Sequence, residues 1–219
     1  MSPTPFQVIH EDAQLIVVDK PSGQVVIPGR GKDEGEPLVD QVTRHIGKKA
    51  FVVHRIDRET SGLVVFAKDA QTHQELSVLW EDRKVHKTYL ALVQGVPSRE
   101  EGTLDQPLKV FGSGRMGVDR KGKPSRTHYR IKESYGRAAL LEVEPETGRR
   151  HQIRVHLYHL GHPVLGDTLY GEDRPVGGAP RLMLHASGVV IPWGGRDLHL
   201  ACELPFDFLN FLKPFKAPN

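Results

Sequence analysis

A short polar loop carries the residue types that could do chemistry. It reads His-Arg-Ile-Asp-Arg-Glu-Thr-Ser-Gly over residues 54–62, and apolar runs precede and follow it. A loop that leaves and enters buried strands is held rigidly, which suits an active site. Asp57 lies between Arg55 and Arg58, whose positive charges favour an ionised carboxylate. Such a carboxylate could act as a nucleophile, a base or an ion-pair partner, and a salt-bridged turn is the alternative interpretation.

A second feature is a basic segment rich in glycine, residues 109–132. It holds eight Lys and Arg residues against one acid, Asp119. Segregated positive charge of this kind favours a mobile loop that binds a polyanion, and a solvated surface loop is the alternative. Arg120, Lys121 and Lys123 lie near its centre and are candidates for phosphate contacts.

Two patterns that could indicate a cofactor or a metal fail on context. Gly112, Gly114 and Gly117 have dinucleotide-binding spacing, but residues 118–124 after them do not form the helix that this fingerprint needs. Four histidines lie between residues 151 and 162, yet no HExxH motif or cysteine pair accompanies them. Surface or hydrogen-bonded histidines are therefore favoured over a zinc site, and we expect neither a metal nor a cofactor.

Length and composition bound the fold. The chain has 219 residues, a net charge of +3, and one cysteine, Cys202. This length is typical of one large domain or two closely packed halves, and we expect a single domain over residues 1–219. One cysteine excludes an internal disulfide and fits a reducing compartment. No apolar run approaches the ~18 residues of a membrane helix, and the N-terminus has no pattern of a signal peptide. We therefore expect a cytoplasmic protein outside the membrane.

The elements that must position these residues mix strands and helices without a regular βαβ period. Apolar runs predict buried strands, which are residues 15–18, 51–53, 63–66, 89–93, 138–143, 182–191 and 198–200. Caps and periodicity predict helices, which are residues 37–46 ending at Gly47, a helix capped by Asp69, residues 149–160 ending at Gly161, and residues 206–211. The pattern indicates an α+β protein with a mainly antiparallel sheet.

The polar loop resembles the HRLDxxTSGLL signature of RNA pseudouridine synthases of the RluA family, with Ile56 in place of the commoner leucine. Further segments resemble motifs of this family in the same order, and they are residues 19–23, 87–95, 147–156, 161–167 and 181–186. Together the similar segments span residues 15–190. The small N-terminal RNA-binding domain of many relatives has no counterpart here, so we expect a short member of the family.

The resemblance implies a fold and a reaction. The fold is a mixed, largely antiparallel central sheet with helices and loops around a catalytic cleft. The reaction is isomerisation of uridine in RNA, in which the N1–C1′ bond breaks, the base turns and C5 joins C1′, without a cofactor. Asp57 is implied as the catalytic carboxylate, which attacks the base or the sugar or abstracts a proton. The resemblance further implies that Tyr89 stacks on the uracil and serves in proton transfer, and that Arg154 pairs with Asp57.

Other residues are predicted to bind the substrate. Leu184 is expected to wall the uracil pocket. Arg55 is expected to occupy the space of a flipped nucleotide, or only to tune the charge on Asp57. The expected partner is a stem-loop of ribosomal RNA, transfer RNA or both, bound by a monomer. Two alternatives are an RNA-binding module without activity and a glycosidase-like hydrolase, which needs a second carboxylate near Asp57, either Asp19 or Asp167.

Overall fold

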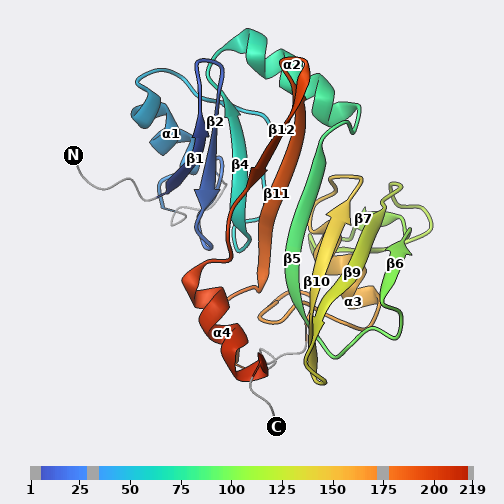
Figure 1. Ribbon diagram of the computed structural model, residues 1–219. Coiled ribbons are helices and arrows are strands. Elements are labelled where there is room, and N and C mark those ends of the chain that lie inside the picture. Colours follow the sequence, from blue (N-terminus) through green and yellow to red (C-terminus); the bar gives the residue numbers. More distant parts are fainter. Residues whose placement is uncertain (1–5, 29–34, 172–177, 217–219) are drawn as a thin grey trace. The chain divides into compact units, whose positions relative to one another are not determined.

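The computed structural model describes residues 6–28, 35–171 and 178–216 (Figure 1), and the chain divides into two compact units. Unit 1 combines Met1–His86 with Ala186–Cys202, and unit 2 combines Lys87–His185 with Glu203–Asn219. Each unit has its own apolar core. Within the described residues, no helix has both the length and the apolar character needed to cross a membrane.

Strands of unit 1 lie in the order β1, β2, β4 and β11 (Figure 1). Their bounds are Gln7–Glu11 for β1, Leu15–Lys20 for β2, Ser61–Ala67 for β4 and Leu184–Trp193 for β11, which begins in unit 2. The short β3 (Phe51–Val52) pairs with β4, and β12 (Arg196–Ala201) pairs with β11. Every residue of β4 is buried, so the strand that follows the polar loop is anchored along its whole length.

Two helices of unit 1 begin and end where their capping residues predict. Helix α1 (Leu38–Ile46) starts after Pro37 and stops at Gly47, which has a φ of 68°. Helix α2 (Ala70–Glu81) starts at Asp69, whose carboxylate accepts a hydrogen bond from the Thr72 amide at 2.8 Å. Helix α2 packs against β3 and β4 and therefore covers the two strands that flank the polar loop.

Unit 2 is built on strands in the order β5, β10, β9 and β6, of which β5 and β6 are green and β9 and β10 are yellow in Figure 1. Their bounds are His86–Gln94, Ala138–Pro145, Thr127–Ser134 and Glu101–Leu104. Strands β7 (Leu108–Val110) and β8 (Met116–Val118) form a separate hairpin. Helix α3 (Gln152–His159) packs against β8, β9 and β10, and α4 (Phe206–Lys216) adds Phe208 and Leu212 to the core.

The expected α+β class and the largely antiparallel sheet are confirmed, and three local expectations are wrong. Residues 109–132 are not a mobile loop, because β7, β8 and most of β9 lie within them. The helix predicted from residue 149 begins only at Gln152, because His151 has a left-handed φ of 55° that an α-helix does not accept. Residues 51–53 are half-buried instead of fully buried.

Candidate active site

The polar loop of unit 1 is clamped along its backbone by the turn that follows β2. The amide of Gly23 donates to the Arg58 carbonyl at 2.8 Å, and Arg58 Nε donates back to the Gly23 carbonyl at 3.0 Å. Ser22 Oγ donates to the Glu59 carbonyl at 2.6 Å. Residues 19–23, which resemble a motif of the family, therefore hold the part of the loop at Arg58 and Glu59 in place.

A buried lysine completes this clamp. Lys20 is 0% exposed, and its Nζ donates to the carbonyl oxygens of Pro21, Gln24 and Arg58 at 2.9 Å each. An ammonium taken out of water needs such acceptors, because its burial is otherwise costly. Sequence reasoning placed Lys20 in a turn and missed this role; the signal was a charged residue directly at the end of an apolar strand.

The first and last residues of the loop, His54 and Gly62, are also fixed. His54 Nε2 accepts a hydrogen bond from the Val65 amide at 3.0 Å, and its ring stacks on Trp80 with centroids 4.9 Å apart. Gly62 has a φ of 113°, and a Cβ there would come within 2.3 Å of the Ala186 carbonyl oxygen. These contacts of His54 and Gly62 fix the shape of the loop.

Asp57 is presented by this fixed loop. Ile56 is buried, whereas Arg55 is exposed and Asp57 is half-exposed. The Asp57 carbonyl accepts from the Thr60 amide at 3.2 Å, and Thr60 is buried. The burial pattern matches an extended stretch in which Arg55 and Asp57 share one side. The rigid loop thus offers a carboxylate and a guanidinium next to each other.

Unit 2 contains a buried ion pair whose arginine lies on α3. Arg154 is 2% exposed; its Nε lies 2.7 Å from Asp167 Oδ2, and its Nη2 lies 2.8 Å from Oδ1. This two-bond geometry is the strongest form of an arginine–carboxylate contact. The pairing of Arg154 with Asp167 was not predicted from the sequence. The pairing of Arg154 with Asp57 stays a prediction.

Asp167 is fully engaged in holding Arg154. Its Oδ1 also accepts from the amides of Leu169 at 2.8 Å and Tyr170 at 3.0 Å. Burial raises the pKa of Asp167, but the bonds and charge of Arg154 and the two amides outweigh it, so the pKa lies below its ordinary value. A carboxylate bound in this way is poorly suited to serve as the second acid of a glycosidase.

Tyr170 links this ion pair to its surroundings. The Arg154 guanidinium lies over the Tyr170 ring, 5.2 Å from its centroid. The Tyr170 hydroxyl lies 2.7 Å from His151 Nδ1 and accepts a bond from the Met116 amide at 3.0 Å. Sequence reasoning missed Tyr170 because it lies outside the matched motifs.

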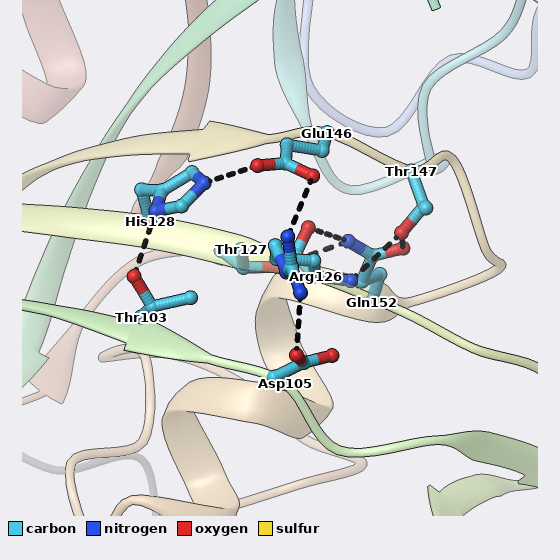
Figure 2. A network of polar contacts seen from close by, with 8 residues as sticks. All are labelled: Thr103, Asp105, Arg126, Thr127, His128, Glu146, Thr147 and Gln152. Carbon is cyan, nitrogen blue, oxygen red and sulfur yellow. Dashed lines mark hydrogen bonds and ion pairs between the residues drawn. The ribbon is translucent and has the colours of Figure 1, made fainter.

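Polar side chains also fix the start of α3, as Figure 2 shows. Gln152 is buried; its Oε1 accepts from Thr147 Oγ1 at 2.7 Å, and its Nε2 donates to Thr127 Oγ1 and the Arg126 carbonyl at 2.9 Å each. Because these bonds tie the first residue of α3 to β9, they set the position of Arg154, two residues further along.

Tyr89 and Leu184 both contact the apolar core of unit 2. Leu184 is 3% exposed and belongs to this core, whereas Tyr89 is half-buried and packs against it. Tyr89 lies on β5 opposite Val143. The stacking role of Tyr89 and the role of Leu184 as a wall of the uracil pocket stay predictions.

The patterns rejected as cofactor or metal sites have structural roles. Gly112 and Gly114 lie in the turn between β7 and β8, where the Gly114 amide donates to the Phe111 carbonyl at 2.8 Å, and the following residues form a strand. Three of the histidines are hydrogen-bonded, as predicted. His156 Nδ1 lies 2.9 Å from Thr127 Oγ1, His162 Nδ1 lies 2.8 Å from the Gln94 carbonyl, and His151 contacts Tyr170.

The basic segment divides into two halves. In the half that forms β9 and its approach, three cations have acidic partners; Arg126 binds Asp105 at 2.8 Å, and Arg130 and Lys132 bind Glu142 at 2.6 and 3.0 Å. In the other half, Arg115, Arg120, Lys121 and Lys123 are exposed and form no ion pair with any residue of the described ranges. Within residues 109–132, the cations without an acidic partner in the described part of the chain therefore lie on the β7–β8 hairpin and in the turn after it.

Comparisons with known proteins agree with this geometry. The family described as RNA pseudouridylate synthase matches residues 14–159. The dual-specificity RNA pseudouridine synthase RluA of Escherichia coli is 36% identical, with 92% of this chain and 93% of the relative covered. Ribosomal large subunit pseudouridine synthase D of Nitrosomonas europaea is 38% identical over 97% of this chain, which spans 66% of that relative. The solved structure of human RNA pseudouridylate synthase domain containing 4 has a TM-score of 0.80 at 28% identity, covering 97% of this chain and 95% of that one.

Proposed function

Because the chain belongs to the RluA family of RNA pseudouridine synthases, which are isomerases, we propose that it converts specific uridines of structured RNA to pseudouridine through Asp57. The observation that carries this proposal is the rigid loop of unit 1, which is clamped at both ends and presents the Asp57 carboxylate on its exposed side. A reacting group is most effective when its position is fixed before the substrate binds.

The proposed reaction uses a carboxylate, and as an isomerisation it leaves the atomic composition of the nucleotide unchanged. The N1–C1′ bond of uridine breaks, the uracil turns, the C5–C1′ bond forms, and the proton lost from C5 is balanced by one gained at N1. Asp57 attacks the base or the sugar, or removes the C5 proton. Tyr89 stacks on the uracil and takes part in proton transfer, and Leu184 walls the pocket. Arg154 acts with Asp57 as its counter-charge while Asp167 holds the guanidinium in place.

The RNA partner is a stem-loop of ribosomal RNA, transfer RNA or both. The names of similar proteins support this range, since one acts on the large ribosomal subunit and another has dual specificity. Arg55 stands beside Asp57 and fills the stack after the uridine leaves it. Arg120, Lys121 and Lys123 contact phosphates. We further propose that residues 1–219 act as one catalytic domain, as a monomer, in the cytoplasm.

A single experiment tests the proposed reaction. The purified protein is incubated with ribosomal and transfer RNA lacking pseudouridine, and pseudouridines are mapped by chemical modification while free uracil is assayed in the same sample. Pseudouridine at defined sites with no free uracil supports the proposal. Release of uracil would support the hydrolase alternative, and RNA binding without either product would support the inactive module.

A further inference from the structure

The β7–β8 hairpin has two different faces. Leu108, Val118 and Met116 pack with Tyr170 and Val155 in a small apolar cluster, so this face is turned inward. Side chains alternate along a strand, and the register pairs Lys109 with Gly117 on the other face. The outward face of the hairpin therefore carries Lys109 and, at its end, Phe111.

Phe111 is exposed although it is a large aromatic residue. It is 44% exposed, and the Lys109 Nζ lies 5.9 Å from its ring centroid. Its ring lies over Gly117, where a Cβ would come within 2.8 Å of Phe111 Cε2. Because Gly117 has no side chain, the Phe111 ring packs against β8 on one side, and the rest of the ring is accessible to solvent.

The hairpin that presents Phe111 is firmly attached. The Met116 amide donates to the Tyr170 hydroxyl at 3.0 Å. Leu108 exchanges two backbone hydrogen bonds with Lys123, at 2.9 and 2.8 Å, and a Cβ at Gly122 would come within 2.6 Å of the Leu108 carbonyl carbon. These contacts bring the turn after β8 back beside β7, so its cations lie next to the hairpin.

Exposed cations lie on the same hairpin and in the turn paired with it. Lys121 and Lys123 in the adjoining turn, with Arg115 at the hairpin end, are exposed and have no acidic partner among residues 6–28, 35–171 and 178–216. Asp119, the acid of this region, is held by Lys109 at 3.7 Å and by the Lys121 amide at 2.7 Å. Aromatic platforms beside cations are how proteins hold unpaired bases and their phosphates.

We propose that the β7–β8 hairpin is an RNA-contact element in which Phe111 stacks on an unpaired base of the substrate while the neighbouring cations hold its phosphates. This inference rests on the proposed function, which supplies RNA as the ligand. A groove lined by residues of β6, β9 and β10 is a poorer candidate, because its three glutamates outnumber its one arginine, Arg130. Charge complementarity therefore selects the hairpin.

The test separates base stacking from attraction to charge. Binding is measured by titration calorimetry with a stem-loop RNA that has unpaired loop bases, and with inorganic polyphosphate, which has charge but no bases. Phe111→Ala should weaken RNA binding about 5- to 150-fold, the range found for one stacked base, and leave polyphosphate binding unchanged. Phe111→Trp should retain RNA binding, whereas Phe111→Leu, which keeps apolar area without a π face, should lose it like the alanine variant.

Phe206→Ala provides the matched control. Phe206 is 76% exposed and has the Lys213 Nζ 5.9 Å from its ring centroid, but it lies on α4, outside the basic segment. Its removal should leave RNA binding unchanged. Unaltered RNA binding by Phe111→Ala, or an equal loss for RNA and polyphosphate, would overturn the inference. Failure of the unaltered protein to form pseudouridine would refute the proposed function instead, and the binding comparison would still be readable.

Discussion

The loop that carries Asp57 and the helix that carries Arg154 are fixed in opposite ways. The loop is held mainly through backbone groups, and the Asp57 side chain is half-exposed. Arg154 is held through its own side chain, in a buried two-bond pair with Asp167. The Asp57 side chain is therefore not among the groups that the cited contacts use to hold the loop, whereas the Arg154 side chain itself forms the contacts that hold it. Substitutions at the two places should therefore affect stability very differently.

The largest combined effect is expected for Arg154→Met. The change leaves the buried carboxylate of Asp167 without its charged partner, and breaking a buried pair in this way costs about 3–5 kcal/mol. The melting temperature should fall clearly, and pseudouridine formation should be lost. Thermal unfolding followed by circular dichroism and a tritium-release assay measure the two effects. A wild-type melting curve together with full activity would show that neither the pair nor the predicted link to Asp57 matters.

Lys20→Met probes the support of the loop without touching Asp57. The carbonyl oxygens of Pro21, Gln24 and Arg58 lose the Lys20 ammonium as a donor, although the Arg58 carbonyl keeps the Gly23 amide. A hydrogen bond to a charged group contributes about 1.5–3 kcal/mol. Both stability and turnover should decrease, with turnover falling more than RNA affinity, because the carboxylate is no longer held in place. Equal wild-type values for unfolding and turnover would mean that the turn and the loop are fixed by other contacts.

The cations of the hairpin half should control the salt dependence of RNA binding. Each neutralised phosphate contributes a slope of about −0.7 to −0.9 in log K against log salt. Replacing Arg120, Lys121 and Lys123 by Gln should weaken binding and flatten this slope by about one to three. Replacing Arg126, Arg130 and Lys132 by Gln is the control, since these side chains already bind acids. An unchanged slope in the first variant would mark the segment as solvated surface only.

The smallest effect, and the most selective, is expected for Arg55→Ala. If Arg55 fills the stack after base flipping, the variant should lose turnover on a folded stem-loop and lose less on an RNA whose target uridine is already unstacked, because unstacking costs about a few kcal/mol. Single-turnover rates on this matched pair measure the difference. The same fold-loss on both RNAs would rule out the flipping role and leave tuning of the charge on Asp57.

The parts of the fold that sequence reasoning found are those with a strong local signal. Strands β2 and β4 are continuous apolar runs, and α1 and α2 carry readable caps at Gly47 and Asp69. Strand β9 was missed because its outward residues, among them Arg130 and Lys132, made it look like a charged loop. Its inward residues, Thr127 and Tyr129, are buried.

For the candidate site, the motif around Asp57 was sufficient to predict the loop but not what holds it. Lys20 and Arg58 are brought together by pairing of distant strands, which no local pattern reveals. Asp167 was considered only as a second catalytic acid, and its place beside Arg154 depends on the fold of unit 2. Partners of buried charges are decided by tertiary structure, so sequence reasoning names the charge more readily than its partner.

The central claim, that the Asp57 carboxylate performs the isomerisation, is tested most directly by Asp57→Asn. The substitution is nearly isosteric and removes only the ionisable group. We predict no detectable pseudouridine in single-turnover assays at enzyme excess, with RNA affinity within a few-fold of the unaltered protein and an unchanged melting temperature. Product formation by the purified variant at close to the wild-type rate would contradict the account.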